Sequence, residues 1–234
     1  MPVAASSPAL REAPPGGLWW FAHWPAGSMA AGLTGRSGGS SALLDAVRIS
    51  EAVSAEQVHG GSVALVGSRR LQGPVAGADA LLTDLPGMAL LIRTADCLPV
   101  FFADPARRAV GLAHAGWRGL AAGLLSRVVA GLRRGCGVRP GALTAALGPG
   151  IRACCYEVGQ EFEARFGPYV QAEGGRRTCD LAGAAREQLM RCGVPPDRII
   201  DSGVCTACDT RRWFSLRREG PETGRLVSMI AIRP

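Results

Sequence analysis

The chain has 234 residues, a formal net charge of +7 and a hydrophobic fraction of 47%. That fraction is enough for a packed core and excludes a largely disordered protein. All 26 basic residues are arginines, but they are scattered singly or in pairs, so we expect no nucleic-acid groove. No stretch approaches the roughly 20 consecutive apolar residues of a membrane span, so we expect no membrane partner either.

The N-terminal segment, 1–17, is rich in proline, alanine, serine and glycine, which predicts a disordered tail. It has no basic start and no apolar core, so it lacks the pattern of a secretory signal. We therefore expect a cytoplasmic protein in which most of the eight cysteines are reduced thiols. The remainder, 18–234, has no evident linker or internal repeat and is predicted to be a single domain.

Short apolar runs bounded by glycine, proline or aspartate predict strands, because a run of about four to eight such residues suits a buried strand. A glycine- and serine-rich segment, 32–41, is interpreted as an irregular loop. The expected strands are 62–66, 88–93, 98–103, 109–113, 142–147, a short one near Ile199, 213–217 and 226–232.

Apolar residues at helical spacing predict a long helix over 120–134, which Gly135 would end. The stripe consists of Leu120, Leu124, Leu125, Val128, Val129 and Leu132. A short helix is expected over 158–166, and Asp180 is placed to cap another helix that ends at Gly193. Strands interleaved with helices predict the fold class α/β (α+β), a single domain with a mixed β-sheet layered against helices.

Two of the three histidines and one cysteine form a candidate metal site. His59 lies in Q-V-H-G, Cys97 in T-A-D-C-L-P-V and His114 in A-H-A-G-W-R-G, each beside a polar or glycine break at a predicted strand end. Two imidazoles and a thiolate suit Zn²⁺ and leave one tetrahedral position open, as in catalytic zinc sites. The third histidine, His23 in W-W-F-A-H-W, is interpreted as structural.

A hairpin between 98–103 and 109–113 would bring Cys97 and His114 together. If Ala103 pairs with Ala109, counting back along both strands places Leu98 opposite His114, with Cys97 beside it. A slip of one residue would turn the two side chains apart. His59 lies on a separate segment, and local spacing does not determine where that segment packs.

The sequence also predicts an anion site beside the metal. His114 is followed by A-G-W-R-G and the long helix, whose N-terminal N–H groups and partial positive charge favour an anion. Arg118 can add a two-pronged contact, and Arg36 in the glycine-rich segment is a second candidate for phosphate binding. Asp96, next to Cys97, is a candidate proton shuttle or a support for the ligand loop.

Two pairs of cysteines leave a further question open. Cys205-Thr-Ala-Cys208 has the C-x-x-C spacing of zinc or redox sites. A structural zinc site would need a second pair, and the adjacent Cys154 and Cys155 fit the usual spacing poorly. The other cysteines are interpreted as small buried hydrophobic residues.

Several strings together resemble the YfiH-type family, also called the laccase-domain or multicopper polyphenol oxidase family. They cover roughly 32–234 and comprise Q-V-H-G, A-D-A-L-L-T, T-A-D-C-L-P-V, A-H-A-G-W-R-G, G-P-G-I, Y-E-V-G, C-T, F-S-L-R-R and T-G-R. The resemblance implies a zinc site at His59, Cys97 and His114 in a layered single-domain fold. It also implies phosphorolysis of purine nucleosides (adenosine, inosine, guanosine and methylthioadenosine) and hydrolytic deamination of adenosine.

The resemblance leaves other activities open. The family's older name implies copper-dependent oxidation of phenols, and a bacterial branch is linked to editing of peptidoglycan precursors. Cys97 as a thiolate nucleophile with His114 as its base would instead make a hydrolase. Only the segment 42–56 separates the glycine-rich loop from Q-V-H-G, which is shorter than in similar proteins and would suit an inactive metal-binding homologue. Our leading expectation is a zinc-dependent purine nucleoside phosphorylase with adenosine deaminase activity.

Overall fold

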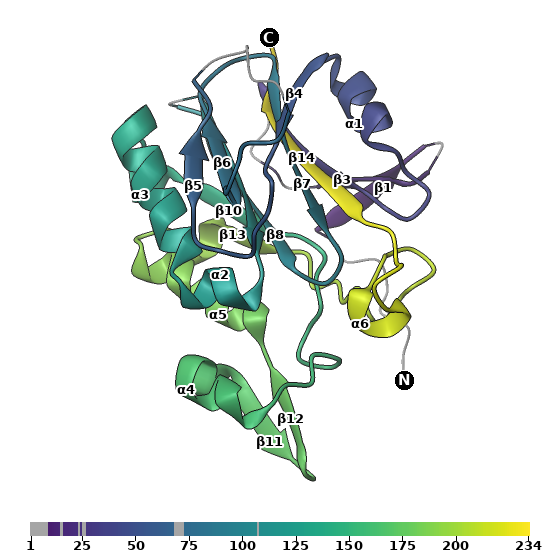
Figure 1. Ribbon diagram of the computed structural model, residues 1–234. Helices are drawn as coiled ribbons and strands as arrows, with labels where there is room; N and C mark the ends of the chain where they lie inside the picture. Colours follow the sequence, from purple (N-terminus) through teal and green to yellow (C-terminus); the bar gives the residue numbers. More distant parts are fainter. Residues whose placement is uncertain (1–8, 15, 23, 25–26, 68–72, 107) are drawn as a thin grey trace.

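The computed structural model describes residues 9–234 apart from 15, 23, 25–26, 68–72 and 107. Its centre is a pair of six-stranded sheets that pack face to face, with helices on their outer faces (Figure 1). The strand order is β1-β2-β3-β14-β7-β4 in the first sheet and β13-β10-β8-β9-β6-β5 in the second. Both sheets contain parallel and antiparallel pairs, which confirms the predicted α/β class with mixed sheet.

The elements are short and follow one another closely. The strands of the first sheet are β1 (Leu10–Ala13), β2 (Leu18–Phe21), β3 (Met29–Thr34), β4 (Glu51–Ser54), β7 (Met88–Thr94) and β14 (Leu226–Ile232). Those of the second are β5 (Val63–Leu65), β6 (Ala80–Thr83), β8 (Leu98–Asp104), β9 (Ala109–Ala115), β10 (Thr144–Leu147) and β13 (Ile199–Asp201). A separate hairpin consists of β11 (Val170–Glu173) and β12 (Arg176–Cys179). The helices are α1 (Ser40–Val47), α2 (Trp117–Ala121), α3 (Leu124–Cys136), α4 (Glu163–Phe166), α5 (Leu181–Arg191) and α6 (Leu216–Glu219).

Alternating side chains along the strands build the layers, because successive residues of a strand point to opposite faces. In β8, Phe101 belongs to the core between the sheets, whereas Val100 and Phe102 pack against the apolar faces of α3 and α5. On the other side of the molecule, α1 packs Leu43 and Val47 against the outer face of the first sheet. Most of the short segment 42–56 is therefore used by α1 and β4.

The long helix predicted over 120–134 is wrong in two respects, since it is two helices and the second continues through Gly135 to Cys136. Gly137, with a φ of 67°, caps its end. α2 ends at Ala121 and α3 begins at Leu124, because Gly123 between them has a φ of 75°, a left-handed conformation that interrupts a helix. The predicted apolar stripe is nevertheless buried against the second sheet. α5 begins as predicted, with the Asp180 carboxylate accepting the N–H of Gly183 at 2.9 Å.

Three other local predictions are corrected by the structure. The expected loop 32–41 contains the end of β3 and the start of α1. In the expected strand 213–217, residues 213–215 form a loop and Leu216 begins α6, where the Ser215 hydroxyl accepts the N–H of Arg218 at 3.3 Å. Within the expected tail 1–17, residues Leu10–Ala13 form β1 because they pair with β2. Residues 1–8 and His23 lie outside the described residues.

The β8–β9 hairpin is present with its register shifted by one residue from the prediction. Asp104 rather than Ala103 pairs with Ala109, and Pro99 rather than Leu98 lies opposite His114. The strand is one residue longer than its apolar run because the Asp104 carboxylate accepts the N–H of Ala106 at 3.0 Å and so begins the turn. Cys97 immediately precedes β8, at the end of the hairpin that carries His114.

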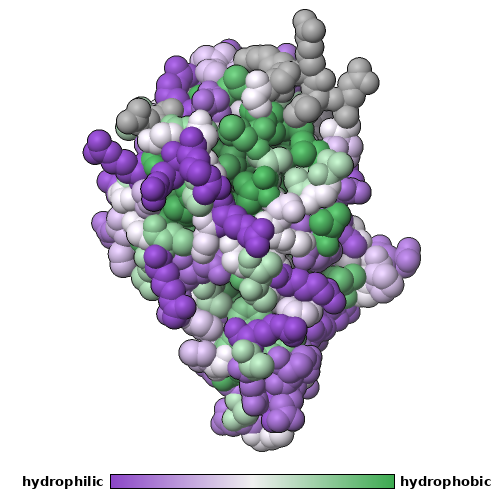
Figure 2. Space-filling view, turned by 60° about the vertical axis from the view of Figure 1, so that its left-hand side comes forward, coloured by the Kyte–Doolittle hydropathy of each residue, from purple (hydrophilic) through white to green (hydrophobic). Residues whose placement is uncertain are grey.

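The surface differs between the body of the molecule and its lower end. The end that carries α4 and the β11–β12 hairpin in Figure 1 is mostly hydrophilic in Figure 2. No helix in the described part of the chain is both long and apolar enough to cross a membrane.

Candidate metal centre

The structure brings His59, Cys97 and His114 together. One ligand atom from each residue lies within 4.8 Å of the others. The two imidazole rings meet edge to face, with their centroids 4.7 Å apart. His59 lies between β4 and β5, Cys97 lies between β7 and β8, and His114 lies within β9. Segments that are distant in the sequence thus converge at one end of the second sheet.

Asp79 holds two of these three residues in place. It directly precedes β6, the strand that pairs with β9, and its own backbone oxygen accepts the N–H of His114 at 2.8 Å. One carboxylate oxygen lies 3.1 Å from Nδ1 of His114 and also accepts the N–H of His59 at 2.8 Å. The other oxygen accepts the N–H of Gly60 at 2.7 Å. Asp79 therefore fixes the His114 ring and shapes the His59 loop, although sequence reasoning did not single it out.

Gln57 ties the same loop to the strand that leads to Cys97. Its side-chain amide donates to the backbone oxygen of Arg93 at 2.6 Å and accepts the N–H of Arg93 at 2.7 Å. Gln57 and His59 both have positive φ values, 66° and 58°, so the loop turns sharply twice within three residues. Such a backbone is held by its contacts with Arg93 and Asp79 rather than by local preference.

Asp96 lies next to Cys97, but its carboxylate is engaged elsewhere. One oxygen accepts the hydroxyl hydrogen of Thr206 at 2.6 Å, and the other accepts the backbone N–H of Arg217 at 2.7 Å. Asp96 also has a φ of 86°, which reverses the chain just before Cys97. These contacts suit Asp96 to support the loop that carries Cys97, and its other predicted role, as a proton shuttle, stays a prediction.

Gly116 gives the three ligands room. A Cβ at this position would lie 3.0 Å from the Cys97 sulfur and 3.6 Å from Cδ2 of His59. A side chain here would thus press on two of the three ligands, which explains a glycine two residues after His114 in A-H-A-G-W-R-G.

Hydrogen bonds within the group shift the ionisation of Cys97 and His114. Burial raises the pKa of Cys97, but hydrogen bonds from His114 and His59 outweigh burial and lower this pKa to about 7. Burial lowers the pKa of His114, but hydrogen bonds with Asp79 and Cys97 raise it to about 9. Cys97 is therefore readily available as a thiolate, the form of cysteine that binds metals and acts as a nucleophile.

The donor set fits a zinc ion. Tetrahedral zinc with Zn–N near 2.0–2.1 Å and Zn–S near 2.3 Å places its ligand atoms about 3.4–3.6 Å apart, and the three side chains are already within 4.8 Å of one another. Because the Asp79 carboxylate faces Nδ1 of His114, Nε2 of that ring is left for a metal. His114 is buried whereas His59 is exposed, so solvent reaches the group from the His59 side.

The two arginines predicted for phosphate binding lie in different settings. Arg118 is exposed and stacks over Trp117, with its guanidinium carbon 4.5 Å from the ring centre. Arg36 forms an ion pair with Glu219, donates to the backbone oxygen of Trp213 at 3.4 Å and lies over the ring of Phe214. The positive charge of Arg36 is thus paired with the carboxylate of Glu219. The contact described for Arg118 is instead with the uncharged ring of Trp117.

Arg217 is a further cation that sequence reasoning missed. It lies over the ring of Tyr156 at 5.1 Å and donates to the backbone oxygen of Glu157 at 2.7 Å. Burial raises the pKa of Tyr156, the Cys97 thiolate raises it further, and the charges of Arg217 and Arg118 act in the opposite direction. The charges of Cys97 and of both arginines therefore act on the Tyr156 hydroxyl.

The anion site predicted at a helix N-terminus loses part of its basis. The helix that follows His114 is α2, which has only 5 residues, and not the long helix that was expected. A helix of little more than one turn carries a small dipole. Any anion beside the three ligands would therefore depend on arginine side chains rather than on helix charge.

Comparisons with known proteins identify the family of this chain. A family model described as multi-copper polyphenol oxidoreductase laccase matches residues 39–233. Purine nucleoside phosphorylase YlmD of Geobacillus stearothermophilus is 36% identical over 197 residues, which cover 77% of this chain and 72% of that protein. Adenosine deaminase RL5, from an unknown prokaryotic organism, is 32% identical over 200 residues, which cover 79% of this chain and 76% of that protein.

The fold is shared as well. The crystal structure of YlmD from Geobacillus stearothermophilus matches with a TM-score of 0.88 and 29% sequence identity, over 97% of this chain and 99% of that one. By sequence, the match spans 60–72% of the length of four relatives that are named purine nucleoside phosphorylases.

Proposed function

The chain belongs to the multi-copper polyphenol oxidoreductase laccase family, and we propose that it is a zinc-dependent purine nucleoside phosphorylase that also deaminates adenosine. The observation that carries the proposal is the convergence of His59, Cys97 and His114. These residues offer two imidazoles and a thiolate, the donor set of an open zinc site. The relatives named as purine nucleoside phosphorylases and an adenosine deaminase support the choice of substrate.

Zinc is favoured over copper by the ligands that the chain can supply. A histidine pair with one cysteine also suits a single copper of the electron-transfer type. Reduction of oxygen by a multicopper oxidase needs several further copper ions with imidazole ligands, and the whole sequence contains only three histidines. This protein thus belongs to the family by its sequence, but we propose that it does not catalyse the oxidation that the family's name describes.

In the proposed phosphorolysis, a phosphate oxygen attacks the anomeric carbon of the nucleoside. The bond from that carbon to the purine nitrogen breaks, and the leaving base takes up a proton. We propose that Arg118, which is exposed and lies four residues after His114 in the chain, neutralises the phosphate. Arg36 would have to leave Glu219 to contact the same anion, so we propose that its main role is to hold α6.

In the proposed deamination, the oxygen of water replaces the exocyclic amine of adenosine and ammonia leaves. A bound zinc ion would supply Lewis acidity for both reactions. The chain itself supplies the thiolate of Cys97, the oriented ring of His114 and the Asp79 carboxylate that holds that ring. Asp96 supports the loop of Cys97 through Thr206 and Arg217.

Product analysis with adenosine tests this function. Full-length protein of known zinc content is incubated with adenosine in the presence and absence of phosphate. We expect adenine and ribose 1-phosphate only when phosphate is present, a smaller amount of inosine, and loss of all products after zinc removal. His114→Ala should abolish both activities while circular dichroism shows that it remains folded. If zinc-loaded, folded wild-type protein forms neither adenine nor inosine, the proposal is wrong.

We also propose a cytoplasmic location. All eight cysteines lie in the described residues and are free thiols, which is the state expected in a reducing compartment.

A further inference from the structure

A second group of potential metal ligands lies outside the centre described above. Cys154 and Cys155 follow β10, and Cys205 and Cys208 follow β13. β10 and β13 are parallel neighbours, so the loops that follow them both leave the sheet at the carboxyl end of these two strands. The parallel pairing continues past the strands, since Gly150 pairs with Cys205 and accepts the N–H of Thr206 at 3.2 Å. The four cysteines are thus brought together by strand pairing.

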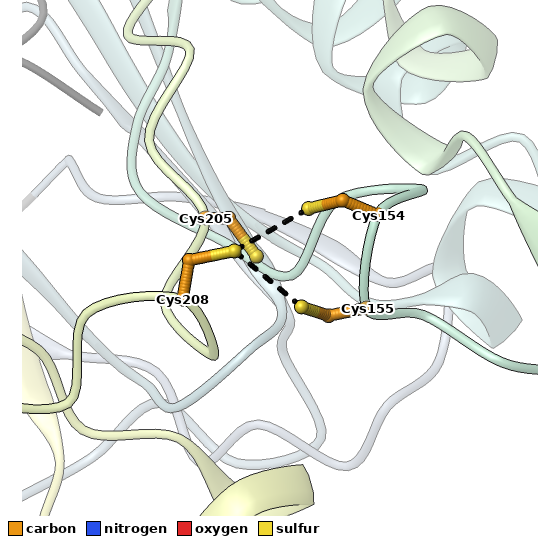
Figure 3. Close-up of side chains that lie close together, drawn as sticks. All are labelled: Cys154, Cys155, Cys205 and Cys208. Carbon is orange, nitrogen blue, oxygen red and sulfur yellow. Dashed lines mark hydrogen bonds between the residues drawn. The ribbon is translucent and has the colours of Figure 1, made fainter. Parts of the chain in front are cut away.

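The four sulfur atoms form a compact group. All lie within 4.8 Å of one another, and the Cys208 sulfur is 3.5 Å from the sulfurs of both Cys154 and Cys155. Figure 3 shows the four side chains pointing toward a common space from two loops. Four thiolates around one zinc ion at about 2.3 Å place their sulfurs about 3.8 Å apart, which is close to this spacing. A disulfide needs about 2.05 Å, so none of these pairs is bonded.

The adjacent pair Cys154-Cys155 fits the usual spacing of zinc ligands poorly, because two zinc-binding cysteines are usually separated by two to four other residues. The structure removes this objection. The N–H groups of Cys155 and Tyr156 donate to the backbone oxygen of Arg152 at 2.9 and 2.8 Å. This tight turn lets the two neighbouring side chains reach toward the same partner, Cys208.

We propose that Cys154, Cys155, Cys205 and Cys208 bind one zinc ion as a closed site of four thiolates. Such a site has no open position, so its role is structural rather than catalytic. An ion with four thiolates carries a net charge of −2. The surface hollow that contains Cys154 and Cys155 is also lined by three arginines and one carboxylate, so these side chains contribute a net charge of +2: Arg176, Arg217, Arg218 and Glu157. Cations that offset this charge make an anionic metal site favourable near the surface.

This second site would stabilise the support beneath Cys97. Thr206 lies between Cys205 and Cys208, and its hydroxyl donates to Asp96, the residue before Cys97. The backbone oxygen of Asp96 accepts the N–H of Ile151 at 2.8 Å, on the loop that continues to Cys154. An ion that joins the two loops would therefore restrain Thr206 and Ile151, two of the residues that donate hydrogen bonds to Asp96.

Metal analysis tests the second site independently of the proposed catalytic function. Full-length protein is purified under reducing conditions, and zinc is measured by mass spectrometry. We expect about two zinc ions per chain in wild-type protein and about one in Cys205→Ser/Cys208→Ser. His114→Ala should also lose one ion but keep the one held by the four cysteines. The matched control Cys136→Ser/Cys192→Ser, outside both groups, should keep both ions.

Cobalt substitution provides the second measurement. Thiolate-to-cobalt absorption grows with the number of sulfur ligands, so His114→Ala should keep most of this signal and Cys205→Ser/Cys208→Ser should lose most of it. Cys154→Ser changes an exposed position and should shift the cobalt spectrum even where the double variant does not fold. The proposal is overturned if the serine variants leave the zinc content and cobalt spectrum unchanged. It is also overturned if these cysteines prove to be disulfide-bonded or to hold iron.

Discussion

Replacing Asp79 by asparagine would test how the candidate centre is held together. The side chain is fully buried, and it accepts the N–H groups of His59 and Gly60 at 2.8 and 2.7 Å while lying 3.1 Å from Nδ1 of His114. Asn keeps the shape but loses the charge, and its NH₂ group must face at least one of these N–H donors. A hydrogen bond to a charged group contributes about 1.5–3 kcal/mol, and breaking a buried ion pair costs about 3–5 kcal/mol.

We therefore expect Asp79→Asn to lower the unfolding free energy of the metal-free protein by about 2–4 kcal/mol, since asparagine retains one acceptor oxygen. We also expect zinc to bind about 10–100-fold more weakly, because the carboxylate orients His114 and raises its basicity as a ligand. Urea denaturation measures the first quantity, and competition with a chelator of known affinity measures the second.

Asp104→Asn is the matched control. Asp104 is also buried and lies on the same sheet, at the far end of the β8–β9 hairpin, where it accepts the N–H of Ala106. We expect this variant to leave zinc affinity unchanged. If Asp79→Asn binds zinc as tightly as the wild type and is equally stable, the carboxylate does not hold the centre and the reasoning is refuted.

Four further predictions concern ionisation and local geometry. In metal-free protein, the rate at which iodoacetamide alkylates Cys97 should rise with pH around a midpoint near 7, and His114→Gln should move this midpoint upward. Because folding lowers the pKa of Cys97, its contribution to stability should be lost as the pH falls through about 7. Gly116→Ala should weaken zinc binding by about tenfold, the lower end of the range for disturbed ligand support, because the new methyl group would lie 3.0 Å from the Cys97 sulfur. Gly123→Ala should lower stability by about 1–2 kcal/mol, since alanine is strained at a φ of 75°.

The alkylation and the two glycine predictions have the following controls or contrary outcomes. Zinc-loaded protein should protect Cys97 from alkylation, and a midpoint near that of an ordinary thiol would contradict the proposed interaction with His114. Gly141→Ala, where a Cβ would meet nothing within 4 Å, is the control for Gly116→Ala. Unchanged zinc affinity in Gly116→Ala would show that the ligands can move away from the methyl group. Equal or higher stability of Gly123→Ala would mean that α2 and α3 can join into one helix.

The local parts of the centre could be predicted from the sequence. Cys97 and His114 lie at the same end of one hairpin, and the apolar runs of that hairpin were recognisable. The one-residue error in register arose because Asp104, a charged residue, continues the strand before the turn. The break at Gly123 was missed because the apolar stripe continues across it and predicts one helix.

The non-local parts could not be predicted from spacing. His59 and Asp79 come to His114 through pairing of β6 with β9 and through the loop that Gln57 fastens to Arg93. A charged residue directly before the wholly buried strand β6 was the available signal for Asp79. The signal for His59 was its residue type beside a glycine break, which did not show where its segment packs. The four cysteines meet through the parallel pairing of β10 with β13, strands separated by about fifty residues whose partnership no local pattern reveals.

The position of the three ligands also bears on when the protein can acquire a metal. His59 and Cys97 lie where the chain passes from the first sheet to the second, after β4 and β7, and His114 lies within the second sheet. The ligands are therefore assembled only after both crossings have formed and β9 has paired with its neighbours. Such contacts between distant segments are slow to form, because the chain must first close long loops. A partly folded chain would lack the complete set, so zinc occupancy should report correct docking of the two sheets.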